Sequence, residues 1–169
     1  TALAAGMAAF IIAPSAWNAV LLDRLLATPD SRLLAAQWCR EHVPAGASIF
    51  QTGTTYSRIQ LTVPTAGPPK GEWGFDEAEG GFTVDGAITT SQPDIVIVQT
   101  SALALYTPVP RGLDAVLARE YQPVWRTAAH PLAAGASVYD WQDAFFLPLA
   151  GFAGIERPGP NIVIYRRRA

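Results

Sequence analysis

The chain has 169 residues, of which 50% are hydrophobic and only 15% are charged. This composition predicts one folded domain with a sizeable core and argues against a disordered chain. The formal net charge is −2, and no basic stripe interleaved with aromatic residues is present, which argues against a nucleic-acid partner. The single cysteine, Cys39, excludes an internal disulfide and a cysteine-based metal site.

The N-terminal segment, residues 1–27, carries no charged residue before Asp23. An apolar run of this length is in the range that spans a membrane, about 20 residues, although Pro14 interrupts it. It lacks the basic start of a signal peptide, and a chain that begins at Thr1 rather than Met predicts a piece of a longer protein. We interpret residues 1–27 as the end of a transmembrane or interfacial helix, with Trp17 at the membrane interface. The alternative is an ordinary buried helix of a soluble protein.

A capped helix that leads into a strand follows this segment. Asp30 is expected to be the N-cap, because its carboxylate can accept from the unpaired amides of the first turn. The helical spacing predicts an amphipathic helix whose packed face is made by Leu34 and Trp38. Residues 43–46, Val-Pro-Ala-Gly, end the helix, and residues 47–51 have the composition of a strand.

The middle of the chain predicts alternating strands and helices. Residues 56–63 alternate polar with apolar side chains, which suits a half-buried strand, with a short helix over 55–61 as the alternative. Residues 93–100 contain four consecutive β-branched residues, which predicts the central strand of a sheet. A helix over 113–120 and a strand over 121–126 are expected next. This order implies a right-handed crossover and partly parallel pairing.

The remaining segments are two strands and two irregular stretches. Strands are expected over 136–140 and 161–166. Residues 141–152 between them are hydrophobic and rich in turn formers, so this stretch either packs under the sheet or presents an apolar patch to a membrane or partner. Residues 64–93 hold many glycines and prolines and are expected to be a long irregular loop, which is usually functional or mobile.

Together these elements predict an α/β fold. We expect a small mixed, partly parallel sheet with flanking helices, in a Rossmann-like order of elements, preceded by an apolar helix. Residues 28–169 form one α/β domain in this interpretation, and residues 1–27 lead into it.

No catalytic constellation is recognisable in the sequence. The two histidines, His42 and His130, lack the spacing of a zinc motif, and no nucleophile elbow or glycine-rich phosphate loop is present. Carboxylates around Asp76 and Asp140 are most simply explained as solvated loop acids or turn caps. We therefore assign no catalytic residue, no metal ligand and no cofactor.

Several segments resemble a family of membrane enzymes. One is the run LATPDSR at 26–32 before a helix that contains Trp38. The others are the segments VPAGASI at 43–49, PDIVIV at 93–98, DAFFLP at 143–148 and RPGPNIVIYR at 157–166. They are similar to the junction, the central strand and the closing segment of polytopic bacterial glycosyltransferases of the protein-mannosyltransferase and aminoarabinose-transferase type, family 39-like. Ser31 replaces the threonine that is commoner in that family.

The resemblance implies a non-catalytic extracytoplasmic domain, anchored in the membrane and facing the periplasm or cell exterior. The parent enzyme would move a sugar from a polyprenyl-phosphate carrier to an acceptor. The acidic catalytic residue of the family lies in its first extracytoplasmic loop, a region this sequence does not contain. Asp30, Arg32 and Trp38 would then form the structural junction that holds the domain over a site elsewhere in the parent protein.

Glycan, lipid-linked sugar or acceptor protein are the partners that this interpretation implies. Sugar faces stack on aromatic rings, so the candidate contacts are Trp73, Phe75, Tyr106, Trp141, Phe145 and Phe146. For two of them, Trp73 and Phe75, the alternative is that they fold back onto the core. Two other functions stay open: a free-standing glycan- or protein-binding module, and a soluble α/β enzyme with a loop-built site around Asp76, His130 and Asp140.

Overall fold

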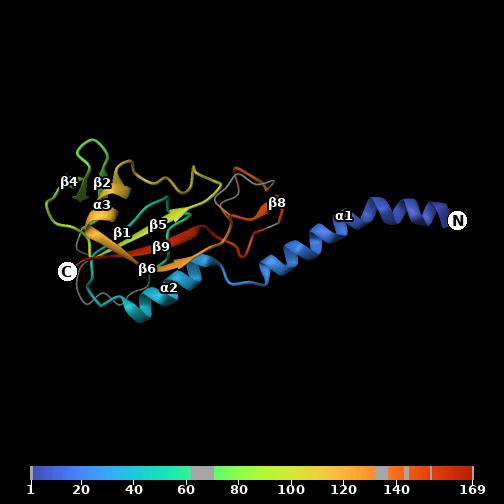
Figure 1. The fold of residues 1–169 in the computed structure, drawn as a ribbon, viewed down its shortest axis with the longest axis horizontal. Coiled ribbons are helices and arrows are strands. Elements are labelled where there is room, and N and C mark those ends of the chain that lie inside the picture. Colours follow the sequence, from blue (N-terminus) through green and yellow to red (C-terminus); the bar gives the residue numbers. More distant parts are fainter. Residues whose placement is uncertain (1, 62–70, 132–136, 143–144, 153, 169) are drawn as a thin grey trace.

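The computed structural model describes residues 2–61, 71–131, 137–142, 145–152 and 154–168. A long helix, α1 (Ala2–Leu26), projects from one end of an α/β domain (Figure 1). Pro14 lies inside α1 without ending it, and nearly all described side chains of the helix are exposed. The segment Gly6–His42, which covers most of α1 and the whole of the next helix, contains an 18-residue window of mean hydropathy 1.3 that is 0% buried. By length and composition alone, α1 can cross a membrane.

The second helix, α2 (Ser31–His42), begins where the sequence predicts. The Asp30 carboxylate accepts the Arg32 amide at 2.7 Å, which confirms the predicted N-cap. The predicted packed face was wrong, because Ser31, Ala35 and Cys39 are buried, whereas Leu34 and Trp38 are only partly buried. Small side chains on this face let the helix backbone approach the sheet closely, which is why the bulkier residues flank the contact.

One four-stranded sheet organises the domain. Its strand order is β1 (Ile49–Gln51), β5 (Ile95–Thr100), β9 (Asn161–Arg167) and β6 (Tyr121–Thr127). β1 and β5 run parallel, and β9 is antiparallel to both β5 and β6. The mixed, partly parallel sheet is therefore confirmed. The helix α3 (Leu113–Glu120) connects β5 to β6, but these two strands do not pair, because β9 lies between them.

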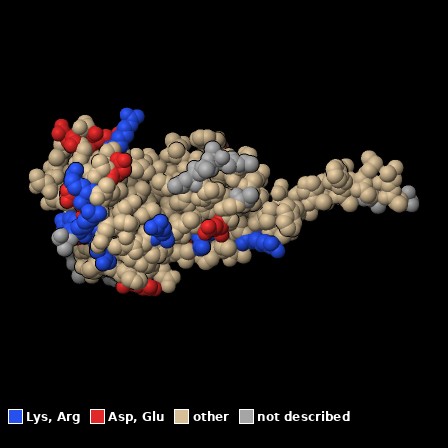
Figure 2. All heavy atoms as spheres, viewed as in Figure 1, with Lys and Arg blue, Asp and Glu red and all other residues tan. Residues whose placement is uncertain are grey.

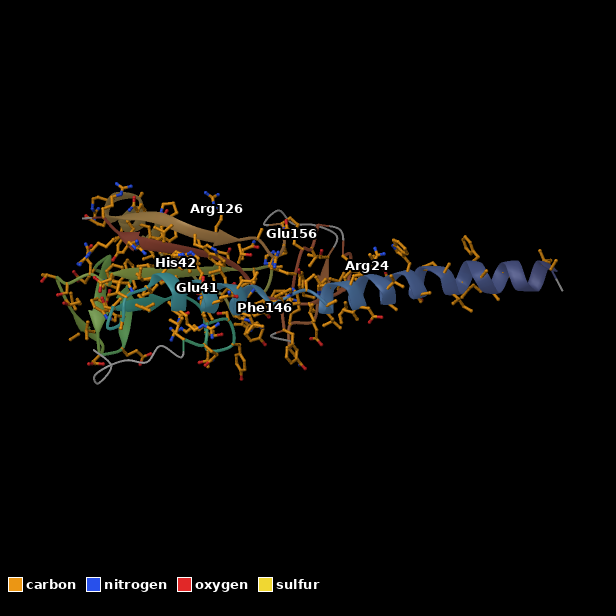
Figure 3. The ribbon with its side chains drawn as sticks, turned by 90° about the horizontal axis from the view of Figure 1, so that it is seen from below. Arg24, Glu41, His42, Arg126, Phe146 and Glu156 are labelled. Carbon is orange, nitrogen blue, oxygen red and sulfur yellow. The ribbon has the colours of Figure 1, made fainter. Side chains whose placement is uncertain are left out.

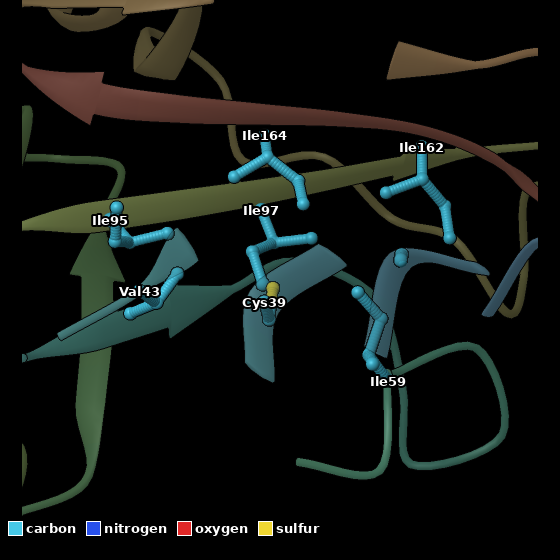
Figure 4. Packing of buried hydrophobic residues seen from close by; sticks show 8 residues of the cluster. Cys39, Val43, Ile59, Ile95, Ile97, Ile162 and Ile164 are labelled. Atoms are coloured by element: carbon cyan, nitrogen blue, oxygen red, sulfur yellow. The ribbon is translucent and has the colours of Figure 1, made fainter. Parts of the chain in front are cut away.

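Successive side chains of β5 point to opposite faces of the sheet and belong to two core layers, one on each face. Ile95 and Ile97 point to the α2 side, where they join Cys39 and the β9 residues Ile162 and Ile164 (Figure 4). On the other face lie Phe50, Phe82, Val96, Val98, Leu113, Val116, Leu117 and Tyr121. The run of five buried residues in β5 follows from burial on both faces.

Two predicted segments differ in the structure. Residues 56–61 form a turn rather than a strand or helix, and residues 62–63 lie outside the described part. The Gln51 side chain replaces a partner strand here, because it accepts the Ile59 amide at 3.0 Å and donates to the Ile59 carbonyl at 3.2 Å. These two bonds satisfy the backbone without a sheet pairing.

The segment 64–93, expected to be irregular, contains a three-stranded antiparallel sheet in its described part; residues 64–70 lie outside it. The strands are β2 (Trp73–Asp76), β3 (Gly81–Val84) and β4 (Ala87–Ile88). Asp85 and Gly86 connect β3 to β4 with φ values of 51° and 78°. An Asp-Gly pair with positive φ at both positions is the preferred two-residue hairpin turn, and this signal in the sequence would have predicted the hairpin.

Near the end of the chain, β7 (Val138–Tyr139) pairs with β8 (Pro148–Ala150). Residue 136, expected in the first of these strands, lies outside the described residues. Figure 1 shows β8 at the end of the domain from which α1 leaves.

The start of α2 is clamped to the loop that precedes β9. The Ser31 amide donates to the Pro158 carbonyl at 3.0 Å, and its hydroxyl donates to the Pro160 carbonyl at 2.6 Å. Gly159 lies between these two prolines with φ 96°, and a Cβ there would overlap Ser31 Oγ and Asp30 Oδ1. Glycine at this position therefore permits the close approach.

We expect Gly159→Ala to lower the free energy of unfolding by about 2 kcal/mol or more, because it combines a positive φ with a steric overlap. Urea denaturation followed by tryptophan fluorescence measures this loss. Gly46→Ala is the matched control, since Gly46 has φ 80° but nothing within 4 Å of a Cβ. An equal loss in the two variants would contradict the close packing of Gly159 on Ser31.

Burial raises the pKa of Tyr121, whose hydroxyl donates to the Pro93 carbonyl at 2.8 Å. The unfolded chain ionises this phenol near pH 10, before the folded state does. The stabilisation from the neutral phenol is therefore complete below about pH 10 and is lost as the pH rises further.

We expect Tyr121→Phe to lose about 1 kcal/mol of stability at pH 7, because the buried hydrogen bond is removed. Above pH 10, its stability should fall less steeply than that of the unchanged chain. Denaturation curves at pH 7 to 11 check both effects, and parallel pH profiles would contradict the assignment.

Candidate functional site

An open cleft of about 410 Å³ lies where the end of β1 meets β2 and β3. β1 is an edge strand of the main sheet, so its outer side is free to face β2. The cleft is lined by Phe50, Gln51, Thr52, Gly53, Arg58, Glu72, Trp73, Gly74, Phe75, Glu77, Thr83, Asp85, Gly86, Pro108 and Pro110. Two of the aromatic residues proposed from the sequence, Trp73 and Phe75, are therefore part of its wall.

Trp73 and Phe75 also pack on the core. Their rings meet Phe82 edge to face, with ring centroids 6.2 Å and 5.4 Å away. Both side chains are half-buried, so they line the cleft and support the layer beneath it. Among the described residues, the buried Trp73 Nε1 has no hydrogen-bond partner. Because this nitrogen atom is itself buried, the part of Trp73 that lines the cleft is its ring rather than its N–H group.

Charged groups line the same cleft. Arg58 donates through Nε to the Gly53 carbonyl at 3.2 Å and lies 3.9 Å from Glu72. Asp85 Oδ1 accepts the Glu72 amide at 2.8 Å. With Glu77, three carboxylates and one guanidinium line the cleft. This balance favours a neutral, hydroxyl-rich ligand over an anionic one, because hydroxyls both donate to carboxylates and accept from N–H groups.

Two of the other aromatic candidates, Tyr106 and Phe146, form a second group near the start of α2. Tyr106 meets Tyr56 and Phe146 edge to face at 5.8 Å and 6.3 Å, and the Arg32 guanidinium lies 5.4 Å from the Phe146 ring centre. The Tyr106 hydroxyl donates to the Trp141 carbonyl at 3.0 Å. Figure 3 shows Phe146 beside α2. This group ties the loops after β5 and β7 to the junction.

Arg32 has several partners in this group. It forms an ion pair with Asp30 at 2.6 Å and donates to the Tyr56 carbonyl at 2.6 Å. A smaller cleft of about 340 Å³ lies alongside, lined by Asp30, Arg32, Leu33, Ala36, Thr55, Tyr56, Arg58 and Gln60. Trp38, the third predicted junction residue, lies further along α2, where it stacks on His42 and Trp125 at 4.8 Å and 6.2 Å.

The six predicted contact residues are thus divided between places rather than gathered in one site. Trp73 and Phe75 line the larger cleft. Phe146 is buried and Tyr106 half-buried in the second group, whereas Trp141 and Phe145 are exposed. The sequence analysis did not single out Tyr56 and Arg58, which lie in the turn after β1. Their signal was hidden because residues 56–61 alternate like a strand.

The loop-built enzyme site is not supported by the geometry. Asp76 accepts the amides of Ala78 and Glu79, and Asp140 accepts the Gln142 amide, so both carboxylates hold turns. Asp76 belongs to β2, whereas Asp140 follows β7, which pairs with β8, and Figure 1 shows β2 and β8 at opposite ends of the domain. Within the described part of the chain, no three His, Cys, Asp or Glu residues gather as a metal site.

Comparison of the chain with known proteins found no matching family model, no matching curated protein and no matching solved structure. The functional conclusion therefore depends on α1, the junction and the cleft.

We expect Trp73→Phe to change the free energy of unfolding by less than about 1 kcal/mol, because the lost indole N–H has no partner to leave unpaired. Trp73→Ala removes the ring contact with Phe82 as well, and we expect a loss of about 2 to 3 kcal/mol. Urea denaturation compares the two. A Trp73→Phe loss as large as that of Trp73→Ala would show that Nε1 is hydrogen-bonded in the folded chain.

Proposed function

We propose that this chain is the membrane-anchored, non-catalytic extracytoplasmic domain of a glycosyltransferase that takes its sugar from a polyprenyl-phosphate carrier. In this proposal α1 is the end of the last membrane helix. Residues 28–169 lie over a catalytic site elsewhere in the parent protein, facing the periplasm or cell exterior. The domain covers that site or binds the acceptor.

The observation that carries the proposal is the short, hydrogen-bonded connection between α1 and the sheet. Leu25, in the last turn of α1, is buried, and α2 starts only a few residues later. The start of α2 is then tied by Ser31 to the loop before β9 and by Arg32 to the Tyr56 carbonyl. A membrane helix connected in this way limits the height and orientation that the domain can take above the bilayer, which a covering domain needs.

The larger cleft supports a role in acceptor binding. Its aromatic wall suits the faces of a sugar, and its carboxylates suit the hydroxyls. The same cleft favours a second candidate, a free-standing glycan-binding module. The two differ in whether catalysis by a parent protein depends on the domain.

The test is a sugar-transfer assay on the parent protein in membrane vesicles, with a polyprenyl-phosphate-linked donor and a varied acceptor. We expect Trp73→Ala to raise KM for the acceptor by about tenfold, since one aromatic stacking contact contributes about 1 to 1.5 kcal/mol. The value of kcat should change little, because no reacting group is removed. Trp125→Ala is the control, since Trp125 lies on β6, outside the cleft.

The proposal also predicts several apolar segments of about 20 residues upstream of Thr1 in the parent gene. A parent without them, and without transfer activity, would contradict it. If the full chain then still binds neutral oligosaccharides in calorimetry, and Trp73→Ala removes this binding, the second candidate takes its place.

A further inference from the structure

Apolar side chains are exposed at the end of the domain from which α1 leaves. Trp141 follows β7 and is 66% exposed, and Leu149 in the middle of β8 is 64% exposed. In β8, Pro148 is buried while Leu149 points outward, so the strand turns its large aliphatic side chain to the solvent. We call the following residues the β8-end patch: Leu105, Val138, Trp141, Phe145 and Leu149, all of them exposed.

Contacts between neighbouring loops hold this end of the domain together. The Tyr106 hydroxyl donates to the Trp141 carbonyl, and the Tyr106 ring packs against the buried Phe146. Ser137 Oγ donates to the Gly151 carbonyl at 2.5 Å across the β7 and β8 pair. The patch is therefore presented on a folded support, so its exposure is a property of the native structure.

The patch lies at the level of the last turns of α1. Leu21, Arg24 and Leu25 of α1 line a shared hollow with Phe152 and Glu156, which follow β8. Figure 3 shows Arg24 and Glu156 near this junction, and Figure 1 shows β8 beside the point where α1 leaves the domain. A bilayer crossed by α1 up to Asp23 and Arg24 would thus end at the height of β8.

The charged side chains lie mostly away from the end of the domain that carries the β8-end patch. On the face shown in Figure 2, most Lys, Arg, Asp and Glu side chains lie on the part of the domain away from α1. The C-terminal arginines, Arg166, Arg167 and Arg168, line a hollow with His42 and Asp94, at the end of β9 that lies farthest from α1. The end beside α1 combines exposed Trp and aliphatic residues with a few exposed charged groups, among them Arg24, Asp140 and Glu156. Trp, aliphatic and scattered charged side chains of this kind occur together in the headgroup region of a membrane.

We propose that the β8-end patch docks into the interfacial layer of the same bilayer that α1 spans. This inference rests on the proposed function, because it requires α1 to be in the membrane. Trp141 would lie at the headgroup level, and Leu149 would reach toward the acyl chains. The domain is then held at two points, the α1 helix and the patch, so it cannot pivot freely about residues 27–30.

Spin labels at three positions of the full chain, in vesicles of phosphatidylcholine and phosphatidylglycerol, test the inference. Leu149→Cys reports on the patch. Phe10→Cys, 84% exposed in α1, reports on membrane insertion, and Ile88→Cys, 59% exposed in β4, is the control away from the patch. The native Cys39 is buried with its pKa raised to about 11, so it does not compete for the label at neutral pH.

We expect the label at position 149 to collide several-fold less with a water-soluble nickel complex, and more with oxygen, than the label at 88. Water-like collision rates at 149 with lipid-like rates at 10 would overturn the docking and leave membrane anchoring intact. Water-like rates at both positions would overturn the proposed function as well. Protection at 149 that disappears in nanodiscs holding one chain each would assign the patch to a second copy and overturn the lipid contact.

A second pair of variants separates docking from simple folding effects. In the Leu149→Cys background, Trp141→Ser should raise nickel collisions at 149 several-fold, whereas Trp141→Tyr should retain the protection, because tyrosine also favours the interface. The circular dichroism spectrum of both variants should match that of the parent chain. Equal effects of Ser and Tyr would contradict interfacial anchoring by residue 141.

Discussion

The contact between Ser31 and the Pro158-Gly159-Pro160 loop is the constraint on which the rest of the structure depends. It joins the first residue of α2 to the segment that leads into β9, an interior strand of the sheet. Ser31 holds the start of α2, a few residues after α1 ends. The proline loop holds the start of β9, the strand that pairs with both β5 and β6. The proposed covering role depends on this contact, because it connects the helix to the sheet without an intervening flexible linker.

Features determined by neighbouring residues could be predicted from the sequence. Asp30 caps α2 by accepting a hydrogen bond from the amide of Arg32, only two residues away. The β-branched run in β5 indicates a buried strand without knowledge of which strands pair with it. Features set by distant residues were missed. Nothing local to β5 or β6 indicates that β9 inserts between them, since that order depends on pairings made across the whole domain. The buried face of α2 was predicted wrongly for the same reason. Ala35 and Cys39 face the sheet because their small side chains let the helix lie close to it, and hydrophobicity alone does not indicate this.

In the candidate site too, features set by neighbouring residues could be predicted and features set by distant residues could not. Trp73 and Phe75, which the sequence singled out because they lie beside carboxylates, line the wall of the larger cleft and also pack on Phe82. Their role as ligand contacts stays a prediction. The pairing of Arg58 with Glu72 joins residues fourteen positions apart, one in the turn after β1 and one just before β2, and periodicity alone does not reveal it. Tyr106 and Phe146, forty residues apart, meet only because the loops after β5 and β7 converge at one end of the sheet.

The position of β9 has a consequence for how the domain folds. It is the last strand in sequence order and supplies both of the pairings that join β5 to β6. Until β9 is present, β6 lacks the partner strand that it has in the described structure. The face of the sheet that packs on α2 also lacks Ile162 and Ile164. During synthesis, the α2-facing side of β5, with Ile95 and Ile97, therefore stays incompletely covered until β9 has been made. Such a domain completes its fold in one late step, dominated by contacts of long sequence separation.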